Sequence, residues 1–300
     1  MRLHPLQVWA PHARTTRGHT GRRIISTTAG PAFRQVLGLS SWDADGFREK
    51  AFRPKIPARL PRDGNISPLL RNGWFQPVKL GENDQSHWSL NYGLWSDLGA
   101  TVVPVEFTWS DVHGKWDFRR LQMPLEFFLE WTKRPPSPSE RLYIAQCQLT
   151  YLPAELKKEI ETPAIVLEAG KGDVYNANLW MGLAPTYTPL HRDPNPNLFL
   201  QLAGRKVVRL FPPETGASIF ANVQEMIGTT SSSVFRGDEM MKGKEREALE
   251  REVWQREDAD FHGFETELEH GEALFIPLGW WHSIKGVGSG ITASLNWWFR

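Results

Sequence analysis

The chain has 300 residues, enough for one large domain or two small ones. Hydrophobic residues make up 40% and charged residues 23%, which is typical of a soluble globular protein. Lysine and arginine number 35 against 34 acidic residues, so no overall basic field indicates a nucleic-acid partner, and no apolar run is long enough to cross a bilayer. The single cysteine, Cys147, excludes an internal disulfide and a zinc site of several thiolates, and it fits an intracellular, reducing compartment.

The N-terminal segment contains no acidic residue before Asp43 but has six arginines among many threonines and serines. That composition is typical of a mitochondrial transit peptide, and the alternative is a disordered, mildly basic tail of a protein of the cytoplasm or nucleus. We expect residues 1–35 to lie outside the fold and residues 36–300 to form a single domain.

The first half of the expected domain mixes turns, helices and strands. Residues 40–82 are rich in proline and glycine and predict short strands and turns that wrap the domain. The elements expected after them are a helix at 88–99 that stops at Gly99, a strand at 100–109, a helix at 124–133, a strand at 141–149 and a short helix at 153–160.

The second half is rich in strands. Residues 197–211 contain two apolar runs around a short glycine-containing turn, which predicts a hairpin. Three more short strands follow at 272–277, 280–284 and 291–299. Short strands with frequent turns predict a mainly β fold, a small barrel or jelly roll flanked by helices.

An insertion at about 214–264 interrupts these strands. Its first half is expected to be a loop and its second half, residues 237–258, a helix. Glu247 stands four residues before Arg251, and Glu252 four before Arg256, the favourable order for ion pairs on a helix surface. We therefore expect a solvated helix without chemistry, although a lid or a partner surface is also open.

Two separated fragments carry the chemistry, TPLHRDPNPN with His191 and Asp193, and GEALFIPLGWWHS with His282. Side chains two apart on a strand project from one face, so His191 and Asp193 should point the same way. Two imidazoles and one carboxylate are the ligand set of a non-haem Fe(II) site with open positions. The His-x-Asp pattern alone is common, and a lone histidine is more often a structural residue than a ligand.

Lys206 follows on an expected strand whose neighbours are apolar. A cation in such a strand needs an anionic partner or must lose its charge. A cosubstrate with a carboxylate would supply that partner; the alternative places Lys206 at the turn, solvated beside Arg205.

Residues 141–299 resemble the JmjC family of Fe(II)- and 2-oxoglutarate-dependent oxygenases of the cupin superfamily, and are most similar to its small protein-hydroxylase branch. The resemblance is carried by residues 188–213 and 271–283 and extends more loosely to 103–107 and 142–146. It implies a double-stranded β-helix, with the barrel core at about 141–300.

The resemblance also implies roles for single residues. His191, Asp193 and His282 match the ligands of the iron, which also binds O2, and Lys206 matches the residue that pairs with the distal carboxylate of 2-oxoglutarate. Positions that hydrogen-bond the cosubstrate or lie near it in this branch are matched by Thr188, Asn197, Tyr143 and Asn296. Substrate positions are matched by Glu106, Trp180 and Gln146, although Glu106 is as readily a solvated carboxylate at the end of a strand.

The function that the resemblance implies is hydroxylation of an amino-acid side chain in a protein or peptide. Lysyl demethylation, hydroxylation of a modified RNA base or a small metabolite, and a non-catalytic cupin binding module remain alternatives. Ala145 stands where the asparaginyl hydroxylase of this branch carries a polar residue, which weighs against asparagine as the target. The sequence gives no sign of the oligomeric state.

Overall fold

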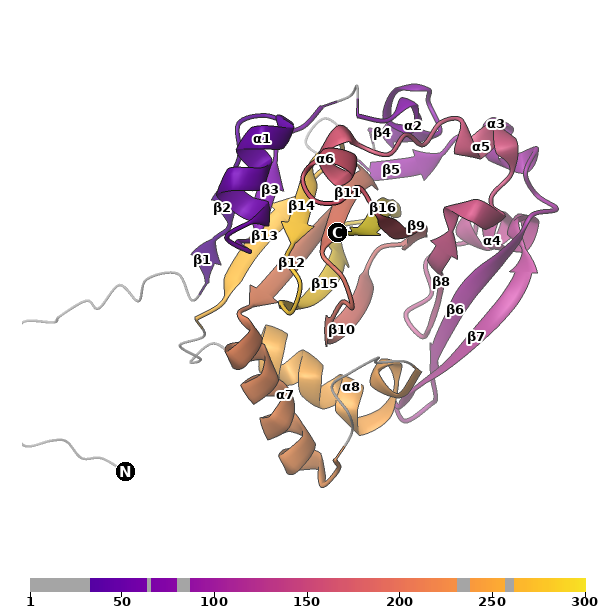
Figure 1. The fold of residues 1–300 in the computed structure, drawn as a ribbon. Helices are drawn as coiled ribbons and strands as arrows, with labels where there is room; N and C mark the ends of the chain where they lie inside the picture. Colours follow the sequence, from indigo (N-terminus) through magenta and orange to yellow (C-terminus); the bar gives the residue numbers. More distant parts are fainter. Residues whose placement is uncertain (1–32, 64–65, 80–86, 231–237, 257–261) are drawn as a thin grey trace, which may run out of the picture. The chain divides into compact units, whose positions relative to one another are not determined.

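The computed structural model describes residues 33–63, 66–79, 87–230, 238–256 and 262–300, and its strands form two main sheets (Figure 1). The five-stranded sheet has the order β1 (Arg34–Gln35), β13 (Phe264–Leu268), β12 (Arg205–Phe211), β15 (Trp281–Val287) and β10 (Thr186–Arg192). The nine-stranded sheet has the order β2 (Leu37–Gly38), β3 (Ala58–Leu60), β14 (Ala273–Ile276), β11 (Asn197–Ala203), β16 (Ile291–Phe299), β9 (Val174–Leu183), β8 (Glu140–Gln148), β6 (Val102–Ser110) and β7 (Trp116–Pro124).

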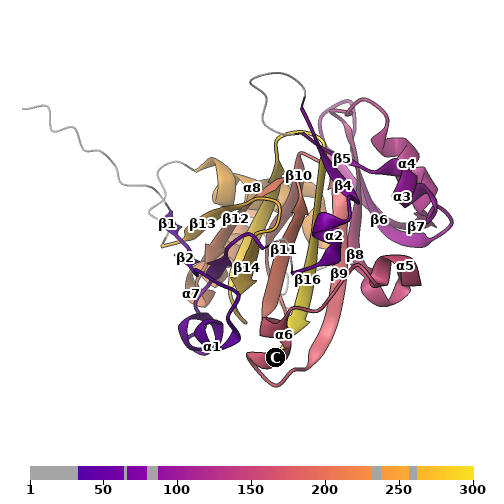
Figure 2. The same cartoon turned by 90° about the horizontal axis from the view of Figure 1, so that it is seen from above.

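The last eight strands divide between these two sheets. Strands β9, β11, β14 and β16 belong to the larger sheet, and β10, β12, β13 and β15 to the smaller one. This division is the double-stranded β-helix, so the mainly β jelly-roll expected from the sequence is confirmed. Strands β6 and β7 extend the larger sheet at the end opposite β2 and β3 (Figure 2).

Helices and a small hairpin surround the sheets. The hairpin consists of β4 (Phe75–Val78) and β5 (His87–Leu90). The α-helices are α1 (Ala44–Phe47), α2 (Pro68–Arg71), α3 (Tyr92–Ser96), α4 (Leu125–Thr132), α5 (Ala154–Lys157), α6 (Ala164–Glu168), α7 (Pro213–Ile227) and α8 (Gly243–Glu250). Short 3-10 turns lie at Leu149–Tyr151 and Asp238–Met241, and π-helical turns at Arg48–Phe52 and Arg251–Gln255.

The main apolar core includes strands of the nine-stranded sheet and side chains of helices α1, α3, α4, α5 and α6. Its largest fully buried side chains include those of Trp95, Phe128, Phe275, Trp297 and Phe299. None of the helices in the described part of the chain combines the length and the apolar character needed to span a bilayer.

The hairpin predicted at residues 197–211 is wrong. Strand β11 lies between β14 and β16, whereas β12 lies between β13 and β15, so the chain passes from one sheet to the other at Gly204, which has a φ of 67°. All seven residues of β11 are buried, as expected for a strand covered on both faces. Two apolar runs around a glycine look the same whether the strands pair or separate.

The helix predicted at residues 88–99 is only partly correct. Residues 87–90 form strand β5, which pairs antiparallel with β4, and only Tyr92–Ser96 is helical. The ring of Trp88 stacks on His270 at 4.5 Å, and this tertiary contact lies outside the reach of a helical pattern. The strands predicted at 100–109 and 141–149 and the helix at 124–133 are confirmed.

The fold begins slightly earlier than residue 36. Arg34 and Gln35 form β1, which pairs in parallel with β13, and the buried ring of Phe33 packs edge-on against Phe211 at 6.0 Å. Residues 33–35 therefore belong to the domain, although we expected them outside it. Residues 1–32, on which the prediction of a transit peptide rests, lie outside the described part of the chain.

The insertion differs most from its prediction. Its first half is not a loop but α7, which has a proline in its first turn, Gly228 as a left-handed cap, and a buried face that includes Phe220 and Val223. The later helix is not simply solvated either, because Leu249 and Val253 are buried in one apolar cluster with α7. The helices α7 and α8 lie side by side beneath the strands of the smaller sheet (Figure 1).

The two surface ion pairs predicted for the insertion have different outcomes. Arg256 lies 2.9 Å from Glu252, as predicted. The guanidinium of Arg251 instead lies 2.9 Å from the sulfur of Met226 on α7, because the two helices pack against each other.

Candidate metal centre

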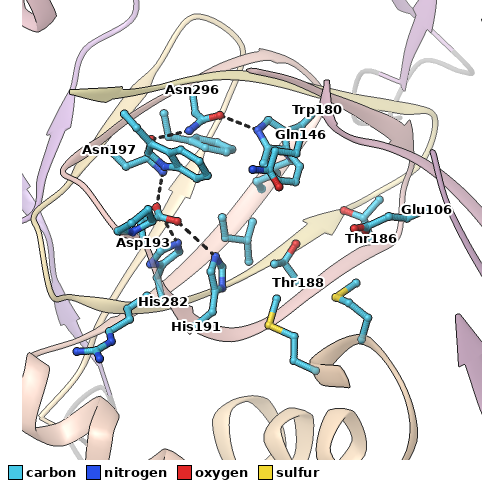
Figure 3. A pocket seen from close by; sticks show the side chains of 18 of the residues that line it. Glu106, Gln146, Trp180, Thr186, Thr188, His191, Asp193, Asn197, His282 and Asn296 are labelled. Atoms are coloured by element: carbon cyan, nitrogen blue, oxygen red, sulfur yellow. Dashed lines mark hydrogen bonds and ion pairs between the residues drawn. The ribbon is translucent and has the colours of Figure 1, made fainter. Parts of the chain in front are cut away.

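Two histidines and one aspartate converge between neighbouring strands of the smaller sheet (Figure 3). His191 on β10 is the direct cross-strand partner of His282 on β15, and Asp193 follows the end of β10. The carboxylate of Asp193 lies 3.6 Å from Nε2 of His282 and 3.9 Å from Nε2 of His191. The three ligand atoms all lie within 4.8 Å of one another, so one ion can contact all three.

The imidazoles are prepared for metal binding. Nδ1 of His191 donates to the carbonyl of Pro189 at 2.8 Å, which leaves the lone pair of Nε2 free. Burial lowers the pKa of His282 to about 4, and the neighbouring His191 adds to this effect. A neutral imidazole is the form that binds a metal. Two imidazoles and a carboxylate therefore fit a divalent first-row metal ion and leave coordination positions open.

A chain of hydrogen bonds orients the carboxylate from behind. Asn197 donates to Asp193 at 2.7 Å and accepts from Asn296 at 3.2 Å. The side-chain oxygen of Asn296 accepts in turn from the indole of Trp180 at 2.8 Å and from Asn178 at 3.2 Å. These residues lie on β9, β11 and β16, so the larger sheet fixes a ligand that the smaller sheet supplies.

Lys206 on β12 is a buried cation with only 2% of its surface exposed. Its ammonium donates to Ser294 at 2.7 Å and to Tyr143 at 3.2 Å, and it lies 4.9 Å from the centre of the Phe199 ring. No carboxylate of the described residues forms an ion pair with it, and burial lowers its pKa to about 7. A buried ammonium without a counter-ion is a receptor for an anionic ligand.

One cavity of about 680 Å³ joins these features. All the side chains singled out in the sequence line it: Glu106, Tyr143, Gln146, Trp180, Thr188, His191, Asp193, Asn197, Lys206, His282 and Asn296. The metal ligands and Lys206 thus share one space, although they come from separate strands.

Gln146 lines the cavity and has an unusual backbone conformation. It has a φ of 51°, which is rare for a residue other than glycine, at a point where the pairing of β8 with β9 shifts register. Strained residues of this kind concentrate at functional sites.

The sequence did not indicate several other lining residues. Thr186 could have been found, because it stands two residues before Thr188 on the same strand. Arg120 pairs with Glu106 directly across β6 and β7, with the side-chain nitrogens 3.2 and 3.3 Å from the carboxylate. Met240 and Met241 come from the insertion, in which we expected no chemistry.

Comparisons with known proteins agree with this geometry. The family model described as a cupin-like domain matches residues 106–300. The chain belongs to the cupin-like JmjC family. This JmjC chain is 29% identical over 223 residues to the lysine-specific demethylase JMJ30 of Arabidopsis thaliana, covering 72% of the chain and 48% of that protein. Over 217 residues it is 27% identical to the lysine-specific demethylase 8 of Danio rerio, covering 71% and 49%.

A third relative is the JmjC domain-containing protein C of Dictyostelium discoideum, 32% identical over 166 residues, with 53% of this JmjC chain and 36% of that protein covered. The chain spans about half the length of the first two relatives and less of the third. The comparisons lend no support to a mitochondrial location.

Proposed function

We propose that the protein is an Fe(II)- and 2-oxoglutarate-dependent oxygenase that modifies an amino-acid side chain of a protein substrate. One observation carries this proposal. The cluster of His191, Asp193 and His282 shares a cavity with Lys206, which is buried and forms no ion pair with a carboxylate of the described residues. When bound, Fe(II) and 2-oxoglutarate together activate dioxygen for oxidation of a C–H bond, with release of succinate and CO2.

The chain's own residues divide the work of binding. The two histidines and Asp193 hold the metal and leave positions open for the cosubstrate and dioxygen. Lys206 receives the distal carboxylate of 2-oxoglutarate, which restores its ammonium charge. Thr188 and Tyr143 line the same space and offer hydroxyl donors to the bound dianion.

The Asn197 and Asn296 amides act one step further from the metal. They hold the Asp193 carboxylate through the chain of hydrogen bonds that ends at the Trp180 indole. Both amides are buried, so water does not compete for their hydrogen bonds. We infer that they keep the carboxylate aimed at the metal before the metal arrives.

The far end of the cavity is proposed to receive the substrate side chain. Glu106 offers a carboxylate, Gln146 an amide and Trp180 an aromatic face, a combination that suits a cationic side chain such as that of arginine or lysine. Arg120 holds Glu106 in the structure and would have to yield to such a substrate.

A second candidate is demethylation of a methylated lysine, which the names of the Arabidopsis and Danio relatives favour. The same oxidation of an N-methyl group would release the methyl carbon as formaldehyde. The two reactions differ in the mass of the product and not in the residues that hold the cosubstrate.

Peptide libraries with central arginine, lysine, methyl-lysine or asparagine test both candidates. Each library is incubated with the protein, Fe(II) and 2-oxoglutarate, and succinate and peptide mass are measured. We expect succinate coupled either to the gain of one oxygen or to the loss of a methyl group. If no peptide changed while an RNA base or a small metabolite was oxidised in a parallel incubation, a protein substrate would be contradicted. The absence of succinate in every incubation would favour a binding module. Asp193→Ala serves as the inactive control.

A further inference from the structure

The metal-bearing strand β10 contains a β-bulge that its sequence does not show. Thr188 pairs with Ile284 and His191 with His282, so two residues of β10, Pro189 and Leu190, stand opposite the single residue Ser283. A bulge of this kind adds one residue to one strand and locally breaks the ladder of hydrogen bonds.

The bulge decides which residues reach the cavity. Side chains of a regular strand alternate, so residues three apart point to opposite faces. Thr188 and His191 are three apart, yet both line the cavity. Leu190, between them, points away from the cavity, because its side chain is fully buried in the outer apolar cluster with Phe220 and Trp281. Without the bulge, Thr188 and His191 could not both line the cavity.

Ser283 fills the gap that the bulge leaves. Its side chain is fully buried, and its hydroxyl donates to the carbonyl of Thr188 at 2.8 Å. The same oxygen accepts from the indole Nε1 of Trp254 at 2.8 Å. Trp254 lies on the π-helical turn Arg251–Gln255 of the insertion. A continuous path of two hydrogen bonds therefore runs from the insertion to the strand that carries His191.

The indole of Trp254 lies close to two cationic side chains. The guanidinium of Arg209 lies 4.5 Å and the ammonium of Lys285 5.0 Å from its ring. Arg209 also donates to the carbonyl of Val253 at 2.5 Å, and Lys285 pairs with Glu250 at 2.7 Å. These contacts come from β12 and β15, so the insertion and the metal-bearing sheet form one packed unit at this point.

We propose that Ser283 and Trp254 are positioning residues of the metal centre: they hold the bulge that brings His191 opposite His282 and into the cavity beside Thr188. The insertion thus supports the metal centre as well as lining the cavity. This inference rests on the proposed function only in assigning His191 and His282 to a metal ion.

The test is an anaerobic titration of the full chain with Co(II), followed by its d–d absorption, in Ser283→Ala and Trp254→Phe. We expect both variants to bind Co(II) about tenfold more weakly and to give an altered d–d band, as for other residues that orient metal ligands. Ser283→Thr, which keeps a hydroxyl, should recover most of the wild-type spectrum. Trp254→Phe keeps an aromatic ring at the site and decides the question if Ser283→Ala does not fold.

Trp42→Phe is the matched control. Its indole also donates a hydrogen bond at 2.8 Å, but the acceptor is the backbone carbonyl of Pro61 and not Ser283. It should lose a similar amount of stability and keep the wild-type Co(II) spectrum. Unchanged Co(II) affinity and spectra in both Ser283→Ala and Trp254→Phe would overturn the inference. Failure of the proposed function would differ, because the wild type would then bind Co(II) but release no succinate.

Discussion

The two ends of the cavity are built in different ways. The inner end consists of His191, Asp193, His282 and Lys206, which come from the barrel strands and the residue directly after one of them. The outer end takes Glu106 and Arg120 from β6 and β7, and a methionine pair from the insertion, all of which lie outside the eight barrel strands. We therefore expect the barrel to hold the metal and the cosubstrate, and the segments attached to it to contact the substrate.

The two ends also differ in how deeply their ionisable side chains are buried. His282 and Lys206 are each 2% exposed, whereas the side chain of Arg120 is 50% exposed. Charges in the interior are weakly screened, while a pair with a half-exposed partner contributes only about 0–1 kcal/mol. Changes at the inner end should therefore have large effects and changes at the outer end small ones.

The largest effect is expected for Asp193→Ala. This change removes the one anionic ligand of the cluster, so succinate release should fall by more than about 100-fold, beyond the loss typical of a residue that only supports a ligand. Asp173→Ala, which removes an exposed carboxylate paired with Arg300, is the control and should leave turnover unchanged. Comparable succinate release by Asp193→Ala and Asp173→Ala would contradict the prediction that changes at the inner end have large effects.

Lys206→Met should separate cosubstrate binding from metal binding. Loss of the ammonium should raise the Kd of 2-oxoglutarate by about 30-fold or more, measured by calorimetry with Mn(II) present. Without 2-oxoglutarate the variant should be at least as stable as the wild type, because a buried cation without an anionic partner lowers the stability of the folded protein. Lys133→Met, at a surface ion pair with Glu130, should leave the Kd unchanged.

The same lysine predicts a pH dependence. Its pKa is about 7 in the folded protein, below the ordinary 10.5, because burial disfavours the charge. Between these values the unfolded chain binds more protons than the folded one, so the stability of the ligand-free protein should rise with pH from about 7 to 10.5. The 2-oxoglutarate affinity should fall over the same window. Urea unfolding at several pH values should show this slope in the wild type and not in Lys206→Met.

A smaller effect is expected for Asn296→Ala. The change leaves the Trp180 indole and the side-chain oxygen of Asn197 without their hydrogen-bond partner. This loss should lower the free energy of unfolding by about 1–3 kcal/mol. Metal affinity should also weaken, because Asn197 then holds Asp193 less firmly. Asn72→Ala, at an exposed bond to Glu159, is the control for a lost surface hydrogen bond. Equal losses of stability in the two variants would argue against the buried network.

The smallest effect is expected for Arg120→Gln at the outer end. Removing the guanidinium releases Glu106 for a cationic peptide, so KM should fall by up to about fivefold while kcat and the Kd of 2-oxoglutarate stay unchanged. A rise in KM would mean that Arg120 assists Glu106 instead of competing with the substrate.

The inner end could be predicted from the sequence more fully than the outer end. The two-residue spacing of His191 and Asp193 predicts that they point the same way, and the apolar neighbours of Lys206 indicate a buried charge. The resemblance to a known family connected these residues to His282. These predictions of the inner-end residues did not depend on knowing how the strands pair.

The remaining features depend on pairing that a local pattern does not contain. The separation of β11 from β12, the cross-strand pair of Glu106 and Arg120, and the bulge opposite Ser283 all follow from which strands meet. Helix α7 was missed because the insertion contains the run TTSSS at residues 229–233, which is typical of a loop. The buried face of α7 packs against the smaller sheet through residues such as Phe220.

Anaerobic addition of Fe(II) and 2-oxoglutarate tests the central claim most directly. If one cavity holds both, the wild type should develop a metal-to-ligand charge-transfer band, which His191→Ala should lack and Lys206→Met should show only at higher 2-oxoglutarate concentration. The absence of a band in the wild type, or a band that persists in His191→Ala, would contradict the account.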